Sequence, residues 1–357
     1  GLKEIRIGVI GYGIRSNVLI GAFGAFEQIA LAAVADPSAK ARDKAARDHP
    51  GAALFEDFRQ MLDSGGVDAV LIESPPNTHA ECAIEALSRG VHVLCDVPAV
   101  HEIDEAQRLW DAGTRSKAIY SFGATTNFWG YVDTCVALKD KGLLGKPFYC
   151  EAEYVADLGD LPTVTPWRKH YEPIRYCTHS LGPILKWVDE DLREVSCFDT
   201  GSHVHGDPDD HDAMVAIYRT QSRVVVKLLI SFCNSHPAPF HRYVYHGTKG
   251  YFEKTHSLAG GETQVLFSTK EIYGMDGLTR LPVTESRPEL SDVPGVGEHG
   301  GADYAMLKDF TDAIAGIKAP AVGMREALRM TLPGLYALKS AQMGGSVVRI
   351  AYPWDNG

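Results

Sequence analysis

The chain has 357 residues, of which 45% are hydrophobic and 23% charged, and this length and composition favour a two-domain globular protein. Its formal net charge of −11, without a basic cluster, argues against nucleic acid or an anionic membrane as a partner and favours a small substrate. The seven cysteines are scattered and never spaced C-x-x-C, which predicts reduced thiols in the cytoplasm rather than disulfides or a cysteine zinc site.

The first third of the chain alternates short apolar runs with amphipathic segments. The predicted strands are apolar throughout, which is typical of parallel strands covered by helices on both faces. We therefore expect residues 1–122 to form a doubly wound α/β domain with a parallel sheet. The strands are predicted at Ile5–Ile10, Leu31–Ala35, Ala69–Ile72, Val91–Cys95 and Ile119–Phe122, and the helices at Ile14–Phe26, Ser38–Asp48, Phe58–Asp63, His79–Arg89 and Ile103–Arg115.

After Phe122 the pattern changes to alternating apolar and polar residues, which is typical of strands with one buried face. We expect residues 123–357 to form an α+β domain with a large, mostly antiparallel sheet. Its strands are predicted at Phe148–Val155, Glu194–Asp199, Met214–Arg219, Arg223–Phe232, Arg242–His246, Tyr251–Glu253 and Gln264–Ser268, and its helices at Tyr131–Lys141, Arg175–Val188, Asp303–Ala315 and Arg325–Gln342. Pro333 is expected to kink or split the last helix, and the Gly/Pro-rich stretch Leu281–Gly301 to be a long loop.

A glycine-rich turn, Gly11-Tyr12-Gly13-Ile14-Arg15-Ser16, lies between the first predicted strand and the first predicted helix. Gly11 permits a tight turn, and Gly13 lets the backbone approach a pyrophosphate at the helix N-terminus. Ser16 replaces the third glycine of the dinucleotide-binding fingerprint, so the motif alone is weak. Asp36 strengthens it, because a carboxylate at the end of the second strand binds a ribose diol and repels a 2′-phosphate. The sequence therefore predicts a Rossmann-type NAD site, rather than an unrelated glycine-rich turn.

Two more segments follow predicted strands at the carboxyl edge of the sheet, where ligands bind in such folds. One contains Pro75, Asn77 and His79, and the other contains Asp96 and Pro98. We predict that these residues, with Gly11, Gly13, Ile14, Arg15 and Asp36, bind the cofactor. The alternative is that they are ordinary loops, since Asn77 is also a suitable helix N-cap.

Taken together, these segments resemble the Gfo/Idh/MocA family of oxidoreductases, and the resemblance extends over nearly the whole chain. It implies a Rossmann domain, a C-terminal α/β domain with an open sheet, and a sugar or cyclitol substrate. It also implies a homodimer or homotetramer that pairs through the C-terminal sheet. The matching stretches are Ile7–Ser16, Val34-Ala35-Asp36-Pro37, Pro75–His79 with Glu81, Gly90-Val91-His92-Val93-Leu94-Cys95, and Gly247-Thr248-Lys249-Gly250.

The chain departs from the ordinary dehydrogenases of that family at the residues that handle the proton. They have Glu-Lys-Pro where this chain has Asp96-Val97-Pro98, and Asp-x-Gly-x-His where it has Arg175 and His179. The resemblance implies that the lysine, the aspartate and the histidine together deprotonate the alcohol as hydride leaves. Only His179 of that set remains, and Arg175 would lower a neighbouring histidine pKa rather than raise it.

The run Tyr176-Cys177-Thr178-His179-Ser180-Leu181-Gly182-Pro183 resembles a second branch, the NAD-dependent α-N-acetylgalactosaminidases and their relatives. Such enzymes oxidise a ring hydroxyl, eliminate the aglycone, add water and return the hydride, so their chemistry is redox-neutral overall. Further matches are Trp167, Pro239-Phe240-His241-Arg242 and His299-Gly300-Gly301-x-Asp303-Tyr304. The branch uses a tyrosine as base at the position of Phe128, which cannot act as one; Tyr154 and Tyr131 are candidate substitutes.

Tyr176 and His179 are three residues apart on a predicted helix and so share one face. A histidine with a phenol beside it can accept and return a proton near neutral pH. Without the Thr-His-x-Leu-Gly-Pro context, His179 would more often be a structural helix histidine. With that context, we predict that His179 and Tyr176 are catalytic.

Candidate substrate-binding residues are scattered through the second domain. Arg242 and His299 are candidates for contacts to sugar hydroxyls, although His299 is equally suited to a solvent-exposed loop. Trp167 and Phe128, with the neighbouring Trp129, could stack on a pyranose ring, but aromatic residues more often pack in a core. Arg175 completes the predicted set.

The segment His203-Val204-His205-Gly206-Asp207-Pro208-Asp209-Asp210-His211 alternates histidines with carboxylates, as metal-binding loops do. Its proline, glycine and aspartates are also ordinary turn residues. We favour a surface loop here and expect no metal site.

Three functions remain open from the sequence. The first is an NAD-dependent oxidoreductase that transfers hydride between a sugar-like hydroxyl and NAD. The second is a redox-neutral glycosidase or lyase in which NAD is recycled. The third is a non-catalytic NAD-binding protein, which Phe128 and Val97 favour and the retained His179 and Tyr176 oppose.

Overall fold

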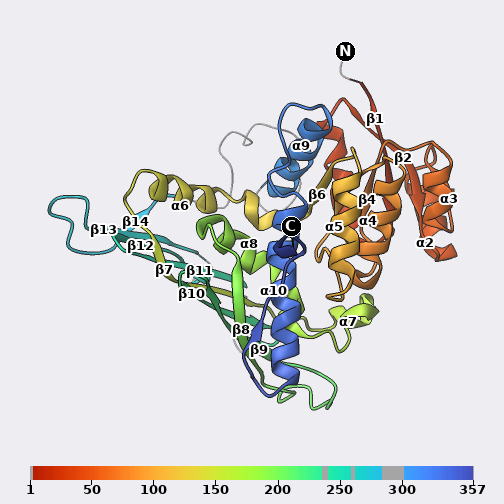
Figure 1. Ribbon diagram of the computed structural model, residues 1–357. Helices are drawn as coiled ribbons and strands as arrows, with labels where there is room; N and C mark the ends of the chain where they lie inside the picture. The colour runs from red at the N-terminus through yellow and green to blue at the C-terminus, as the bar shows by residue number, and fades with distance from the viewer. Residues whose placement is uncertain (1–2, 235–239, 259–261, 284–300, 357) are drawn as a thin grey trace. The chain divides into compact units, whose positions relative to one another are not determined.

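The computed structural model describes residues 3–234, 240–258, 262–283 and 301–356 (Figure 1). The chain divides into two compact units. Unit 1 comprises Gly1–Thr125, Ser286–Leu328 and Asn356–Gly357, and unit 2 comprises Thr126–Glu285 and Arg329–Asp355. The contacts therefore group a late segment with the N-terminal residues, whereas the sequence suggests a single boundary after residue 122.

Unit 1 is built on a six-stranded parallel sheet with the order β3-β2-β1-β4-β5-β6. The chain proceeds outward from β1 first through β2 and β3, and then through β4, β5 and β6, so the strand order reverses at β1. This confirms the predicted doubly wound Rossmann sheet and puts the expected ligand crevice at the carboxyl ends of β1 and β4. The strands are β1 Ile5–Ile10, β2 Ile29–Ala35, β3 Ala53–Phe55, β4 Ala69–Ile72, β5 His92–Cys95 and β6 Tyr120–Phe122.

The helices of unit 1 follow the predicted positions with shifted ends. α2 begins where predicted because the Ser38 hydroxyl accepts a hydrogen bond from the Ala41 amide at the helix N-terminus. α1 ends at Gly21, and a 3₁₀ turn takes the place of the predicted last turns. The helices are α1 Ile14–Gly21, α2 Ala39–Asp48, α3 Phe58–Asp63, α4 His79–Ser88, α5 Glu105–Arg115 and α9 Ala302–Ile314.

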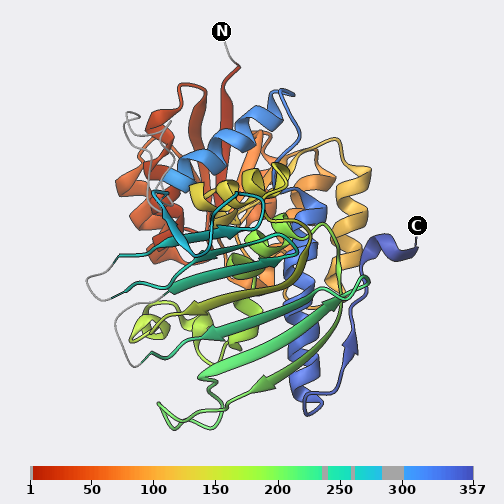
Figure 2. The ribbon, with the colours of Figure 1, turned by 90° about the vertical axis from the view of Figure 1, so that its left-hand side faces the viewer.

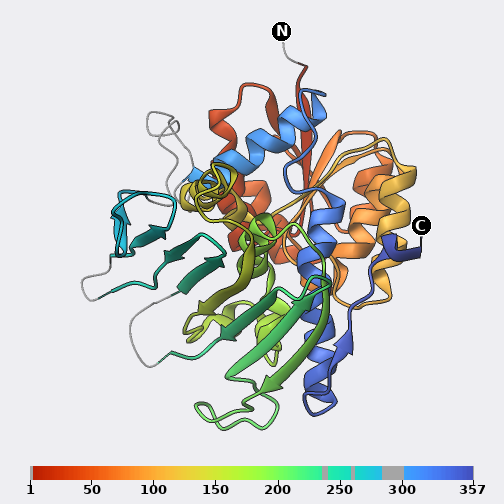
Figure 3. The same ribbon diagram turned by 60° about the vertical axis from the view of Figure 1, so that its left-hand side comes forward.

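Unit 2 is built on a nine-stranded sheet with the order β14-β13-β12-β11-β7-β10-β9-β8-β15 (Figures 2 and 3). The pair β7 and β10 is parallel and the other neighbours are antiparallel, which confirms the predicted mostly antiparallel sheet. In Figure 3, β15 near the end of the chain lies beside β8. The strands are β7 Pro147–Val155, β8 Leu192–Asp199, β9 Ala213–Thr220, β10 Val225–Ser231, β11 Phe240–Gly247, β12 Gly250–Lys254, β13 Val265–Thr269, β14 Thr279–Leu281 and β15 Val348–Arg349.

One face of this sheet carries the core of unit 2. Along β7 the side chains from Tyr149 onward alternate between partly exposed and buried. Trp187 of α8 packs edge-on against the rings of Tyr243, Tyr245 and Phe252. Within the described residues, no helix combines the length and hydropathy that a membrane span requires. The helices are α6 Gly130–Asp140, α7 Leu161–Val164, α8 Thr178–Trp187 and α10 Met324–Gln342, of which α10 begins in unit 1.

In this part of the chain one predicted helix begins later than expected, and one possible break in a helix is absent. The predicted helix Arg175–Val188 is divided into a 3₁₀ turn, Pro173–Tyr176, and α8, which begins at Thr178. α10 runs through Pro333 without the predicted split. The Pro333 carbonyl accepts a hydrogen bond from the buried Tyr218 hydroxyl, which helps to hold this turn against the sheet.

Candidate functional site

The glycine-rich turn of unit 1 has the geometry that a dinucleotide-binding loop needs. Gly11 has a φ of +90°, and a Cβ on it would lie 2.7 Å from the Ser74 amide nitrogen, so no other residue fits there. A Cβ on Gly13 would meet no described atom within 4 Å, which leaves open space for a pyrophosphate beside α1. The Ser16 hydroxyl accepts a hydrogen bond from the Gly13 amide and donates one to the Gly13 carbonyl. Ser16 therefore stabilises the turn in which the third glycine is missing.

Asp36 lies directly after β2, as the sequence predicts for a ribose-binding carboxylate. Its Oδ2 accepts a hydrogen bond from the Tyr12 amide, and its Oδ1 accepts one from the Ser38 amide, both at 2.8 Å. These bonds orient the carboxylate beside the glycine-rich turn while leaving lone pairs on both oxygens for a diol. The residues of unit 1 therefore fit a dinucleotide without a 2′-phosphate.

The loops after β4 and β5 are held together by His79. Its Nδ1 lies 2.7 Å from the Pro98 carbonyl oxygen and its Nε2 lies 2.7 Å from the Ser74 carbonyl oxygen. The ring is almost completely buried, so His79 positions the two loops. Pro75 and Asn77 are exposed on the first loop, and Asp96 on the second accepts a hydrogen bond from the Val97 amide.

A group of partly and fully buried charged side chains lies at the same edge, and two of its members, Glu73 and Asp303, were not among the predicted site residues. Glu73 follows β4 directly; burial, the charge of Asp96 and a hydrogen bond with Asp96 raise its pKa well above the ordinary value. Arg15 pairs with Asp303, whose side chain is fully buried. Burial lowers the pKa of Arg15, but the Asp303 hydrogen bond and the charges of Asp96, Asp303 and Glu73 raise it above the ordinary value. The sequence contained one indication of this group, because Glu73 is a charged residue directly after the apolar strand β4.

Tyr176 and His179 come together in unit 2 as predicted, although no continuous helix carries them. Their rings are 5.2 Å apart in an edge-to-face arrangement. The His179 carbonyl accepts a hydrogen bond from Thr126 Oγ1 at 3.0 Å and another from the Tyr243 hydroxyl, so the start of α8 is fixed to its neighbours. The predicted catalytic pair is therefore built on a rigid backbone.

His241 belongs to the same cluster and was missed as a site residue. Its ring is 6.4 Å from that of His179, 5.1 Å from Tyr154 and 5.1 Å from Trp129. Tyr154 in turn lies 5.1 Å from Tyr176. Two imidazoles and two phenols thus form one cluster, which we call the His179–His241 cluster; they come from β7, β11, the 3₁₀ turn Pro173–Tyr176 and the start of α8.

Arg242, and not His241, was the predicted substrate-binding residue on β11. The side chains of these two neighbours point to opposite faces of the sheet. Arg242 forms ion pairs with Glu151 at 2.6 Å and Glu253 at 3.1 Å, away from the cluster. Because side chains alternate along a strand, His241 lies on the same face as the buried Tyr243. This alternation would have identified His241 as a candidate site residue. Arg242 is therefore engaged in a charge network of the sheet.

The other predicted substrate-binding residues have different surroundings. Phe128 is buried in a 3₁₀ turn next to Trp129, which touches the cluster. Trp167 packs edge-on against Tyr171 and stacks under the guanidinium of Arg168. Arg175 is almost buried and pairs with Glu172 at 2.7 Å. His299 lies outside the described residues.

Tyr154 does not have the chemistry of the missing base. Burial, and then the nearby Tyr176, raise its pKa well above the ordinary value, which disfavours a phenolate near neutral pH. An imidazole is the better proton acceptor in this cluster, because its ordinary pKa lies near neutral pH.

Comparisons with known proteins agree with this geometry. Residues 5–124 match the family described as "Oxidoreductase family, NAD-binding Rossmann fold", Gfo/Idh/MocA. A glycosyl hydrolase family 109 protein of Saccharopolyspora erythraea is 24% identical, with 97% of this chain and 82% of the relative covered. An alpha-N-acetylgalactosaminidase of Shewanella oneidensis is 24% identical over 53% of this chain and 45% of the relative.

Among solved structures, levoglucosan dehydrogenase in complex with NADH and levoglucosan has a TM-score of 0.81 to this chain. The two chains are 19% identical, and the match covers 98% of this chain and 100% of the other. This likeness shows a common fold. Residues 5–124 therefore match an NAD-binding Rossmann domain of the Gfo/Idh/MocA type, and the cofactor of this domain is NAD.

Proposed function

We propose that this protein is an enzyme that transfers hydride between NAD and a ring hydroxyl of a carbohydrate or cyclitol. The observation that carries the proposal is the His179–His241 cluster, in a chain whose other unit has the NAD-binding turn. Bound NAD supplies the acceptor for a hydride, and the protein residues must then accept the hydroxyl proton.

His179 is the residue we assign to that proton. A neutral imidazole accepts the hydroxyl proton while the C–H electron pair leaves its carbon as hydride, so a carbonyl forms and charge is balanced. The Tyr176 ring beside it restricts the imidazole, and fixation of the His179 carbonyl by Thr126 holds the start of α8 in place. This arrangement replaces the lysine and aspartate that the chain lacks.

The aromatic rings of the cluster suit a carbohydrate. The rings of Tyr154 and Tyr176, with that of the neighbouring Trp129, lie beside the polar nitrogens of the two histidines. Sugars have both apolar and polar surface, with C–H groups on the ring faces and hydroxyl groups on the edges. Aromatic side chains cover the C–H faces of such molecules, and nearby polar groups form hydrogen bonds with their hydroxyl groups.

A second candidate is redox-neutral cleavage of a glycoside. The match over 97% of this chain to a protein named for glycosyl hydrolase family 109 favours it. That reaction needs a second base, because oxidation at one carbon acidifies the neighbouring C–H, whose proton must be removed as the aglycone leaves. His241 is the residue in the cluster that can take this proton, since Phe128 has no basic atom and burial disfavours ionised Tyr154.

One assay separates the two candidates. The protein is incubated with NAD and a panel of free sugars, cyclitols and chromogenic aryl glycosides, and nicotinamide reduction and phenol release are followed together. NADH formation without phenol identifies the dehydrogenase. Repeated phenol release from catalytic NAD, without net NADH, identifies the glycosidase. NAD binding with neither signal across the panel would contradict both, and His179→Gln should abolish whichever signal is found while leaving NAD affinity unchanged.

We also propose that the enzyme works in the cytoplasm as a homodimer or homotetramer. All seven cysteines are free and six are buried, which suits a reducing compartment. Light scattering on the eluting peak of a sizing column measures the assembly, and a monomer at micromolar concentration would overturn that part of the proposal.

A further inference from the structure

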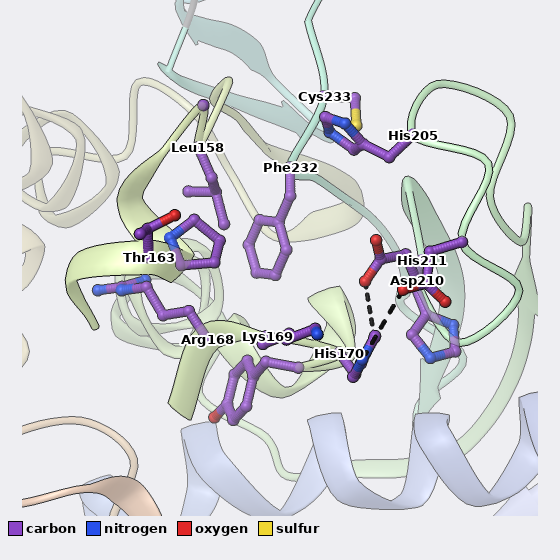
Figure 4. A pocket seen from close by; sticks show the side chains of 14 residues that line it. Leu158, Thr163, Arg168, Lys169, His170, His205, Asp210, His211, Phe232 and Cys233 are labelled. Atoms are coloured by element: carbon purple, nitrogen blue, oxygen red, sulfur yellow. Dashed lines mark hydrogen bonds and ion pairs between the residues drawn. The ribbon is translucent and has the colours of Figure 1, made fainter. Parts of the chain in front are cut away.

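A cavity of about 420 Å³ in unit 2 lies where the loop between β8 and β9 meets the segment after α7 (Figure 4). The loop supplies His205, Asp207, Asp210 and His211 to its wall, and the segment supplies His170. Taken alone, the sequence of this loop favours a surface connection. The fold adds a histidine that lies 40 residues before Asp210.

His170 faces two carboxylates in different ways. Its Nδ1 lies 2.8 Å from Asp210 Oδ1 (Figure 4). Its Nε2 lies 4.0 Å from Asp207 Oδ2. An ionised carboxylate only accepts hydrogen bonds, so the proton of a neutral His170 ring is on Nδ1. Its Nε2 then has a lone pair, but the 4.0 Å gap to Asp207 Oδ2 is too long for a hydrogen bond.

A metal ion fits that gap. Bonds from a transition metal to imidazole nitrogen and carboxylate oxygen are each about 2.0–2.2 Å, so two of them span up to about 4.4 Å. Asp209 offers a third ligand atom, and the three atoms of His170, Asp207 and Asp209 all lie within 4.8 Å of one another. Asp209 is exposed at the loop surface, so a small side-chain movement brings its oxygen closer.

The local charge also favours a cation. Three carboxylates, those of Asp207, Asp209 and Asp210, lie around one imidazole. In the part of the chain that the structure describes, no lysine or arginine forms an ion pair with any of the three. Arg168 and Lys169 also line the cavity, and the Arg168 guanidinium lies over the ring of Trp167, 4.3 Å from the centroid.

We propose that His170, Asp207 and Asp209 bind one divalent transition-metal ion, with Asp210 orienting the imidazole through Nδ1. A carboxylate on the second nitrogen of a metal-binding histidine fixes its tautomer and strengthens the ligand. One imidazole and two carboxylates favour Zn²⁺ or Mn²⁺ over Mg²⁺. The ion links the β8–β9 loop to the segment after α7, and water completes its coordination at the edge of the cavity. This site is independent of the NAD chemistry proposed above.

The test uses the full chain, freed of metal by a chelator, titrated with ZnCl₂ and separately with MgCl₂ in a calorimeter. We expect one Zn²⁺ per chain, at least tenfold weaker binding of Mg²⁺, and a higher melting temperature with Zn²⁺. His170→Asn and Asp207→Asn should each weaken Zn²⁺ binding at least tenfold. Asp210→Asn should weaken it about tenfold, because it removes only the orienting carboxylate.

His211→Asn is the matched control, because His211 is in the same loop and its Nδ1 pairs with Asp199 instead. Its Zn²⁺ affinity should stay within twofold of the parent. The proposal is overturned if the parent binds no Zn²⁺, or if His170→Asn binds Zn²⁺ as the parent does, which would assign binding to other surface histidines. Circular dichroism of the metal-free variants checks folding, and Asp209→Asn at the exposed position serves as the test if His170→Asn does not fold.

Discussion

Arg15 and Asp303 are 288 residues apart in the sequence and form a two-point ion pair. Arg15 Nη2 lies 2.6 Å from Oδ1 of Asp303, and Nη1 lies 3.2 Å from Oδ2. The pair joins the first turn of α9 to the first turn of α1, next to the glycine-rich turn. Asp303 is completely buried and the Arg15 side chain is 25% exposed, so water screens this pair less than a surface pair.

Replacing Asp303 by asparagine should lower the free energy of unfolding by about 3 kcal/mol, because the change leaves a largely buried guanidinium without its anion. It should also weaken NAD binding, since Arg15 is next to the turn. Asp312→Asn is the control on the same helix: it removes a pair with the half-exposed Lys308 and should cost about 0.5 kcal/mol or less. Urea unfolding measures both, and equal losses would contradict the special role of the Arg15 pair.

Glu73 should make stability fall as the pH rises. Burial and Asp96 raise its folded pKa, whereas the unfolded carboxyl keeps its ordinary value. Below the ordinary value both states are protonated and the effect is absent. Between the two pKa values the unfolded state has lost the proton that the folded state retains, so stability decreases by up to about 1.4 kcal/mol per pH unit.

Glu73→Gln reproduces the protonated side chain and should remove this dependence. The variant and the parent should differ by a constant amount below pH 4.5, the ordinary carboxyl value, and the stability of the variant relative to the parent should increase as the pH is raised above it. Chemical unfolding of both proteins, without and with NAD, measures the difference. A difference that is also constant above pH 4.5 would show that Glu73 is already ionised in the folded protein.

Gly11 and Gly13 should respond differently to alanine. Gly11→Ala puts a Cβ 2.7 Å from backbone at a positive φ, so we expect a loss of about 2 kcal/mol or more in stability. Gly13→Ala meets open space and should cost about 1 kcal/mol or less, yet it fills the place of the pyrophosphate and should weaken NAD binding at least tenfold. Melting curves and NAD titrations separate the effects, and unchanged NAD affinity in Gly13→Ala would contradict the assigned pyrophosphate position.

Asp36→Asn should shift the preference from NAD toward NADP. The amide oxygen can still accept one of the bonds from the Tyr12 and Ser38 amides, so the turn should be retained. The charged acceptor for the ribose diol is lost, and so is the repulsion of a 2′-phosphate. Hydrogen bonds to charged groups are worth about 1.5–3 kcal/mol, so the ratio of the two dissociation constants should change about tenfold or more. A ratio that does not change would place the adenosine ribose elsewhere.

Local patterns predicted much of the fold and part of the site. Apolar runs predicted β1 and β4 at their observed positions. The glycine-rich pattern and the acidic residue after the second strand predicted the places of Gly11 and Asp36. β3, β14 and β15 were missed because a strand of two or three residues has too few positions to show a period.

The residues of the site that the sequence missed are those whose role depends on distant partners. Asp303 and Arg15 are far apart in the sequence, and so are His170 and Asp207. Each pair is brought together only by the tertiary structure. His241 is different, because strand alternation around Arg242 contained the necessary information. The family resemblance favoured Arg242, whereas the alternation of side chains along the strand indicated His241.

His241→Asn should lower kcat about 100-fold or more if the imidazole exchanges a proton in the reaction. The variant keeps a polar side chain of similar reach, and the neighbouring Tyr154 and Trp129 rings can stay in place. It should also remove one limb of the pH–rate profile, which a purely structural role would leave unchanged. His246→Asn is the control on the same strand, because His246 packs against Tyr251 on the other face, and its kcat should stay within about twofold. A profile for His241→Asn that keeps both limbs would assign the proton transfer to His179 alone.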